Sequence, residues 1–261
     1  MEYSSNCPEM TGREILELFI ESGLHAVGGN KVQWKDTAVC VGIVSLEGGA
    51  KTVLINRSST RHHAEDGLIG FFEENQKRIN SVKILSKYSP CSNPGFDCCG
   101  RLREMKKKLI KGNGKEMSFE LVFSALYKII RPSCLQRGCF KGSASGHNPS
   151  EESRENIENL VSLGLSVRTF GTGDWAELIE LLALWDASRG MSGTGLASIR
   201  YGDKYGRWRD FEDAELKRDF EILKQRLEGE VRVRMNSLRK IDVTILEKEV
   251  CKIKEALAQW K

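Results

Sequence analysis

The 261-residue sequence contains no long apolar run. A helix that spans a membrane needs about 18 or more consecutive apolar residues, and no stretch of this chain approaches that length. Residues 1–10 are polar and acidic, so they lack the apolar segment of a secretory signal peptide. We therefore expect no membrane partner and a location in the cytoplasm, the nucleus or both.

A strong net charge is also missing. Lys and Arg number 40 against 36 Asp and Glu, which gives a net charge of +4. This balance permits a basic groove for nucleic acid without requiring one. The eight cysteines are scattered along the chain, which argues against the dense disulfide framework of small secreted domains. The length is sufficient for one large domain with an appendage.

Hydrophobic periodicity divides residues 1–190 into helices and strands. Two β-rich runs, 37–46 and 51–55, flank Gly48-Gly49 and predict a β-hairpin. The pattern predicts further strands at 82–88, 119–130 and 165–170, and helices at 12–23, 63–78, 98–111, 150–163 and 174–188. Strands that alternate with helices after a hairpin indicate an α/β fold. We expect a mixed five-stranded sheet flanked by helices, antiparallel at one end and parallel beyond.

The composition changes beyond residue 190, where we place the end of the main domain, 1–190. Residues 191–211 are rich in glycine and serine and then in basic and aromatic side chains, which indicates a linker. The run from Arg200 to Arg209 suits binding to a nucleic-acid backbone with base stacking, and a solvated linker explains it equally well. Residues 212–261 predict a helical extension, as a hairpin or a short coiled coil, which could mediate homo-oligomerisation.

The most specific pattern is His63-Ala64-Glu65, followed by Pro90-Cys91 and then Cys98. One imidazole and two thiolates supply three ligands for Zn²⁺, and three protein ligands leave the fourth tetrahedral position open for water, as in catalytic sites. Glu65 is next to a ligand without being one, and can move protons there. The alternative is a structural zinc site, which requires a fourth protein ligand. His63 and Cys98 open predicted helices at the carboxyl edges of strands, where α/β sheets usually build sites.

On these residues the sequence resembles the AID/APOBEC-like polynucleotide cytidine deaminases. The resemblance extends over about residues 12–188, and its matching segments are 61–65, 87–91, 98 with 101–102, 124–127 and 163–170. It implies a cytidine-deaminase-like fold in which His63, Cys91 and Cys98 hold Zn²⁺ and Glu65 shuttles protons. The implied reaction is hydrolytic deamination of cytosine to uracil in single-stranded DNA or RNA.

The resemblance also implies which residues surround the target base. Those that would bind the base are Ala64, Tyr88, Ser89 and Tyr127, with the carbonyl of Ser89 accepting a hydrogen bond from the cytosine amino group. Those that would contact the rest of the nucleic acid are Arg61, His62 and Arg131.

The sequence departs from the family in the spacer between its cysteines, which is longer here and comprises the six residues 92–97. Pro94-Gly95 favours a turn, so the additional residues can bulge outward and leave Cys98 in place. Cys99 is the rival ligand, and we prefer Cys98 because Leu102 then matches the family's apolar position. Two other functions stay open: deamination of free nucleosides, and nucleic-acid binding by a catalytically silent member of the fold.

Overall fold

The computed structural model describes residues 1–22, 37–92, 95–114, 117–136, 149–202 and 206–258. Its strands are β1 (Glu2–Ser5), β2 (Val39–Leu46), β3 (Lys51–Arg57), β4 (Ile79–Ser86), β5 (Ser118–Phe123) and β6 (Ser166–Thr169). Within the described residues these six strands form one sheet in the order β1-β3-β2-β4-β5-β6. β2 is antiparallel to both β3 and β4, whereas the pairs β1–β3, β4–β5 and β5–β6 are parallel.

The expected fold class, a mixed α/β sheet flanked by helices, is confirmed, with six strands instead of five. The additional strand, β1, pairs in parallel with residues 52–55 of β3. Its sequence is short and polar, so hydrophobic periodicity gave no signal for it. The predicted hairpin is present, because Gly48 and Gly49 take φ values of 77° and 81° that favour glycine. β5 ends at Phe123 and not at residue 130, since the chain turns away and Lys128 adopts a φ of 51°.

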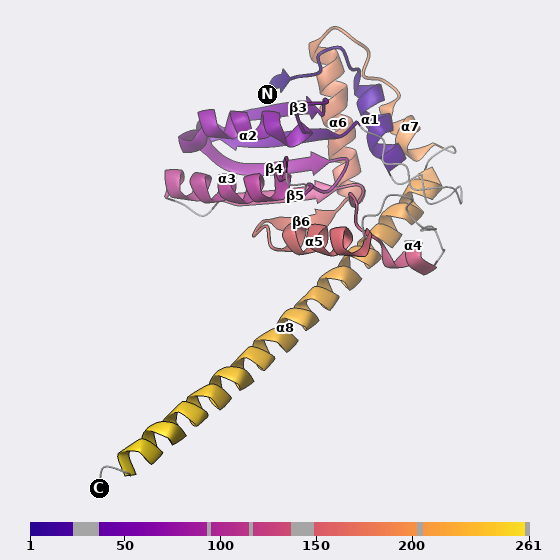
Figure 1. The fold of residues 1–261 in the computed structure, drawn as a ribbon. Coiled ribbons are helices and arrows are strands. Elements are labelled where there is room, and N and C mark those ends of the chain that lie inside the picture. The colour runs from indigo at the N-terminus through magenta and orange to yellow at the C-terminus, as the bar shows by residue number, and fades with distance from the viewer. Residues whose placement is uncertain (23–36, 93–94, 115–116, 137–148, 203–205, 259–261) are drawn as a thin grey trace. The chain divides into compact units, whose positions relative to one another are not determined.

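The helices cover both faces of the sheet. They are α1 (Gly12–Ile20), α2 (Ala64–Glu74), α3 (Cys98–Asn113), α4 (Pro132–Gln136), α5 (Pro149–Val161), α6 (Thr172–Ser188), α7 (Leu196–Tyr201) and α8 (Gly206–Ala258), with short 3-10 turns at Glu47–Gly49 and Gln76–Arg78. α2 and α3 lie against one face, and α1 and α6 lie against the other (Figure 1). Among the described residues, no helix combines the length and the apolar character needed to cross a membrane.

Alternation along β2 explains this two-sided packing. Val41 and Ile43 belong to the main apolar core, which also contains the buried side chains of α1 and α6. Gly42, between them, points to the opposite face, where a Cβ would meet Leu68 of α2 at 2.7 Å. Successive side chains of a strand point to opposite faces, so a strand that is apolar at nearly every position must be covered on both sides.

The C-terminal region was expected to contain a linker and a helical extension, as a hairpin or a coiled coil. The folded unit extends from Met1 to Phe220, beyond the boundary expected at residue 190, and Glu221–Lys261 forms a second unit. Within the expected linker, Arg200 and Arg209 are 1% and 0% exposed. α8 continues to Ala258 without an interruption at the expected break, so the hairpin is not present, whereas association of α8 in a coiled coil stays a prediction.

Candidate metal centre and active site

The candidate site lies at one edge of the sheet, where three strands end. β3, β4 and β5 run in the same direction, because β2 is antiparallel to β3 and β4 and β5 is parallel to β4. The segments that leave their carboxyl ends therefore start at the same edge. α2 follows β3 and begins just after His63, and α3 follows β4 and begins at Cys98. The sheet edge predicted from the motif is confirmed.

Three potential metal ligands converge there. The Nδ1 atom of His63 is 3.1 Å from the Sγ atom of Cys98 and 3.3 Å from the Sγ atom of Cys91. All three ligand atoms lie within 4.8 Å of one another, and the two cysteines are buried. Zinc bonds of about 2.0–2.3 Å in a tetrahedral arrangement place ligand atoms roughly 3.5 Å apart. The three side chains therefore fit a bound zinc ion.

Hydrogen bonds at the helix starts hold these ligands in place. The backbone N–H of His63 donates to Asp66 Oδ2 at 2.9 Å, and Asp66 also pairs with Arg101 of α3, so the two ligand-bearing helices are joined. At the start of α3, Asp97 Oδ1 accepts a hydrogen bond of 3.0 Å from the N–H of Gly100. Asp97 is therefore the N-cap, as the sequence predicted.

The electrostatics of the cluster favour a cation. Glu65 is 6% exposed, and its Oε2 atom lies 3.5 Å from Cys98 Sγ. Burial raises the pKa of Glu65, and the nearby charge of Cys91 raises it further. The hydrogen bond with Cys91, burial and the charge of Glu65 likewise raise the pKa of Cys98. Three acidic groups share this buried space with one imidazole, and a divalent cation would offset their repulsion.

Cys99, the rival ligand, points away from this cluster. Its backbone N–H donates to the carbonyl of Cys91 at 3.0 Å, and its thiol donates to the carbonyl of Pro90 at 3.4 Å. Burial raises the pKa of the Cys99 thiol to about 12. Cys98, and not Cys99, belongs to the group that can hold a metal ion.

One contact of the site was missed in the sequence. The ring of Phe96, in the long spacer, stacks on the imidazole of His63 with a centroid distance of 4.0 Å and an interplanar angle of 17°. Phe96 is half-buried. The sequence did contain a signal for this contact, because the long spacer between the two cysteine ligands includes an aromatic residue. The spacer thus supplies one wall of the candidate metal centre.

The residues expected around the base are also brought together. Tyr88 is buried and Tyr127 is half-buried, and their ring centroids are 5.8 Å apart. The N–H of Ser89 donates to the carbonyl of Ala125 at 2.8 Å, and the N–H of Tyr127 donates to Ser89 Oγ at 2.9 Å. The segment after β5 is therefore hydrogen-bonded to the stretch that leads to Cys91. Ala64 is buried at the first position of α2.

The expected nucleic-acid contacts divide into two groups. Arg61 and His62 are exposed just before α2. Arg131 is buried and pairs with Glu212 and Asp219 of α8, and this position argues against the predicted contact with nucleic acid.

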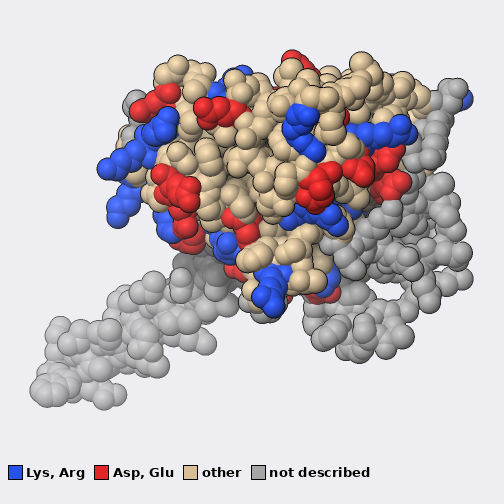
Figure 2. All heavy atoms as spheres, turned by 90° about the horizontal axis from the view of Figure 1, so that it is seen from above, with Lys and Arg blue, Asp and Glu red and all other residues tan. Residues whose placement is uncertain are grey.

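The described residues of the basic run 200–209 expose only some of its basic side chains. Of its three arginines, Arg200 and Arg209 are buried and pair with Asp213, whereas Arg207 is exposed. On the face in Figure 2, basic and acidic side chains of the described residues are interspersed, without a continuous basic area. Tyr201 and Arg207 are exposed, so nucleic-acid binding by this run stays a prediction, and its residues Lys204 and Tyr205 lie outside the described residues.

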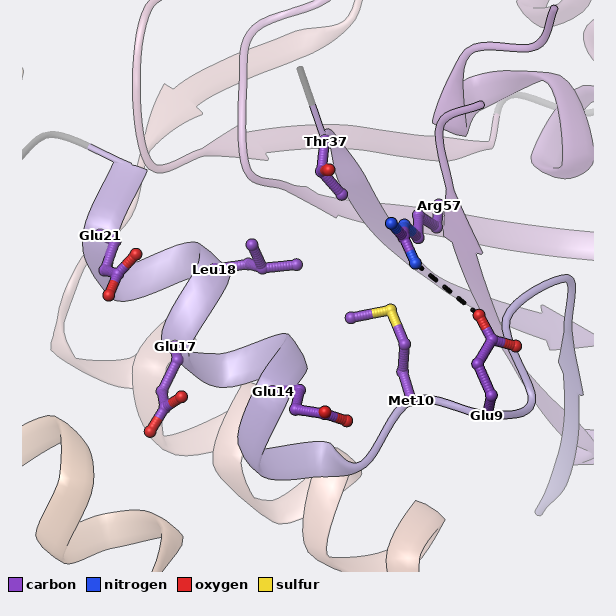
Figure 3. Close-up of a pocket in the computed structure, with 8 residues that line it drawn as sticks. All are labelled: Glu9, Met10, Glu14, Glu17, Leu18, Glu21, Thr37 and Arg57. Carbon is purple, nitrogen blue, oxygen red and sulfur yellow. Dashed lines mark ion pairs between the residues drawn. The ribbon is translucent and has the colours of Figure 1, made fainter. Parts of the chain in front are cut away.

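A hollow of about 380 Å³ lies elsewhere on the folded unit, lined mainly by α1 and the segment before it (Figure 3). It shares no lining residue with the candidate metal centre. Several of its acidic side chains already have partners. Glu9 pairs with Arg57 at 3.7 Å, Glu14 accepts the Thr11 N–H at 2.8 Å, and Glu17 accepts from Arg13 at 3.1 Å. These contacts account for the cluster as part of the local structure.

Comparison with known proteins gives a weak likeness to solved structures and none to a family. No family model matches the chain, and no curated protein matches it. Among solved structures, the chain is similar to a C-terminally truncated form of the Rib2 deaminase of Aspergillus oryzae, with 13% sequence identity and a TM-score of 0.30. The similarity covers 71% of this chain and 97% of that chain. A likeness at this level does not establish a shared reaction.

Proposed function

We propose that this chain is a zinc-dependent deaminase that hydrolyses cytosine to uracil in single-stranded DNA or RNA. One observation carries the proposal: His63, Cys91 and Cys98 meet at the ends of β3 and β4, with the buried carboxyl group of Glu65 beside them. Three ligands without a fourth protein ligand are typical of catalytic zinc sites. The order and spacing of these residues match the zinc-deaminase signature apart from the longer spacer.

The residues of the chain have distinct roles in this proposal. When bound, zinc lowers the pKa of a water molecule and so supplies a nucleophile at neutral pH. Glu65 takes one proton from the attacking water and delivers it to the base nitrogen, and it then takes the second proton of that oxygen and delivers it to the departing amine, which leaves as ammonia.

The base would be held by the segments that follow β4 and β5. Tyr127 offers a half-buried ring for stacking, beside the buried ring of Tyr88. The side chain of Ser89 accepts the N–H of Tyr127, and the resemblance assigns its carbonyl to the cytosine amino group. Ala64 adds a small buried side chain between His63 and Glu65. A single strand is the expected substrate because a base in a duplex is hidden.

The test is conversion of cytosine to uracil by the purified zinc-loaded chain, with sequencing of pooled single-stranded DNA and RNA substrates. Glu65→Gln should lower the rate by about a hundredfold or more, because general acid–base catalysis contributes about that much. The matched control is Glu74→Gln, the same substitution at an exposed residue of the same helix. The control should match the wild type in rate, and both variants should retain zinc.

Two alternatives have distinct outcomes in the same assay. Exposed Arg61 and His62 beside the site favour a polynucleotide substrate. Turnover of free cytidine or deoxycytidine without turnover of oligonucleotides would instead indicate a nucleoside deaminase. Tight oligonucleotide binding by the folded zinc protein without any conversion would indicate a catalytically silent binding protein.

We also propose that the second unit, Glu221–Lys261, mediates self-association. Its helix follows the folded core, and isolated helices are marginal in water unless an apolar face is covered. Leu223, Leu227 and Val231 are spaced four residues apart, and Val231 is 58% exposed. Sedimentation equilibrium of the full chain should give a mass above one protomer, and Leu227→Glu should lower it. A monomer at all concentrations would contradict this proposal.

A further inference from the structure

The segment that would carry the stacking tyrosine is held at both ends by α8. This substrate-facing segment comprises residues 124–131, between β5 and α4, and contains Tyr127. At its start, the Nη2 group of Arg209 donates to the carbonyl of Ser124 at 2.9 Å. At its end, the Nε group of Arg131 donates to Asp219 at 2.8 Å. Arg209 and Asp219 both belong to α8 and to the folded unit that ends at Phe220.

Arg209 makes further contacts that fix its position. It is fully buried, and its Nη1 group donates to the carbonyl of Ile20 at 3.2 Å and to Ser22 Oγ at 3.3 Å. Its Nε group donates to Asp213, one turn later in α8, at 2.8 Å. A planar guanidinium group can donate in several fixed directions at once, which a lysine cannot reproduce. Arg209 thereby connects α8 and α1 to the start of the substrate-facing segment.

Several hydrogen bonds also hold the end of the substrate-facing segment, at Arg131. Asp219 accepts hydrogen bonds from the N–H of Ser133 at 3.1 Å and from its hydroxyl at 2.5 Å, in addition to the bond from Arg131. Arg131 also pairs with Glu212, and all these charged groups are nearly inaccessible to solvent. Buried ion pairs seldom add net stability over apolar packing, but they restrict the geometry of the groups that they join.

The held segment is connected directly to the candidate site. Ser124 Oγ donates to the carbonyl of Lys87 at 2.9 Å, one residue before Tyr88. The carbonyl of Ala125 accepts the N–H of Ser89 at 2.8 Å. A displacement of Ser124 would therefore shift both the ring of Tyr127 and the stretch from Tyr88 to Cys91.

We propose that residues 206–220 of α8 position the substrate-facing segment and that Arg209 is the positioning residue at its start. The inference rests on the proposed function, because it gives this segment the task of holding the base. It makes the first turns of α8 a part of the active site and not an appendage. The interactions that carry it are formed within one chain.

The experiment compares hydrogen–deuterium exchange of the full-length wild type with that of Arg209→Lys. The matched control is Arg207→Lys, the same substitution at an exposed position two residues earlier. Arg209→Lys keeps the positive charge beside Asp213 and removes the planar fork. Amides of residues 124–131 and of Ser89 should exchange about tenfold faster, since one hydrogen bond to a charged group is worth about that factor or more. Exchange in α2 and α3, and the zinc content, should stay as in the wild type.

A second variant, Asp219→Asn, tests the other end and keeps the shape of the side chain. It should also accelerate exchange in residues 124–131 without affecting α2. Unchanged exchange in this segment in both variants would overturn the proposal. Faster exchange throughout the domain, together with zinc loss in both variants, would overturn it as well, because α8 would then support the whole fold and not this segment.

Kinetics add a readout that general stability would not produce. In Arg209→Lys, KM for a single-stranded oligonucleotide should rise severalfold with little change in kcat, whereas Arg207→Lys should match the wild type. An unchanged KM would overturn the positioning role. If the wild type deaminates none of the substrates, the proposed function fails, and the exchange measurement still decides whether α8 holds the segment.

Discussion

Replacing Phe96 should weaken zinc retention, although Phe96 is not a ligand. Its ring stacks on His63 at a centroid distance of 4.0 Å, and the residue is half-buried. A zinc-bound imidazole is electron-poor, so the negative face of the phenyl ring attracts it more strongly than it attracts a free imidazole. Aromatic pairs are worth about 0.5–1.5 kcal/mol beyond their buried area. A loss of about 1 kcal/mol in metal binding raises the zinc Kd about fivefold.

The assay is zinc release from the loaded protein to a chromophoric chelator in excess. Phe96→Ala should release zinc about fivefold faster if association is unchanged, and Phe96→Trp should stay near the wild type because it keeps an aromatic face. Phe96→Leu keeps much of the apolar volume but removes the aromatic ring, so it should release zinc as fast as the alanine variant if stacking is responsible. Phe71→Leu, at a half-buried aromatic residue of α2, is the control. If Phe96→Leu retained zinc as well as the wild type does, the stacking argument would be refuted.

Three other predictions concern the ligand set and the stability of the fold. Cys98→Ser should lose bound zinc whereas Cys99→Ser should keep it, as judged by metal content; the reverse result would make Cys99 the ligand. Arg131→Met should lower the free energy of unfolding in urea by about 3–5 kcal/mol, because it leaves buried carboxylates of α8 without a partner, and a negligible loss would contradict the ion pairs. Burial alone would raise the pKa of Asp174, but hydrogen bonds from two basic side chains outweigh it and lower the pKa from 3.8 to about 2. A lowered pKa means that the carboxylate stabilises the fold above pH 3.8 and loses this effect as the pH falls toward 2. Asp174→Asn should therefore be about 2 kcal/mol less stable than the wild type at pH 7, with a difference that shrinks below about pH 4; a difference independent of pH would exclude this explanation.

The candidate metal centre could be predicted from the sequence because local rules determine it. His63 and Cys98 each stand at the start of a helix that follows a strand, and strands of one direction end at one edge of a sheet. The N-cap at Asp97 was readable because an acidic residue preceded the first helical residues. To place His63 and Cys98 at the same edge of the sheet, it was not necessary to know which strand pairs with which. The direction of the strands, which follows from the hairpin and the helical crossovers, was sufficient.

The roles of the buried arginines could not be read in the same way. Arg131, Arg200 and Arg209 looked like exposed basic residues because arginine is almost never fully buried unless it is paired. Their partners Glu212, Asp213 and Asp219 lie in α8, and for Arg131 the separation along the chain is 81 and 88 residues. Periodicity within a segment contains no information about the distant pairing of Arg131, and it does not show that Arg209, four residues from Asp213 in the same helix, is buried. The same limit explains the missed strand β1, whose four polar residues pair with β3 about fifty positions later.

The long spacer between the cysteines does not displace the ligands, because the loop is closed at its base. The backbone N–H of Cys99 donates to the carbonyl of Cys91 at 3.0 Å, so the two ends of the loop are joined directly beside the ligands. Asp97 then turns the chain into α3 with a φ of 36° and caps it through the N–H of Gly100. Once these contacts are made, the number of residues in the loop affects its outer part and not the separation of Cys91 and Cys98. An insertion of this kind adds a side chain to the wall of the site, here Phe96 against His63, without changing which atoms can hold the metal.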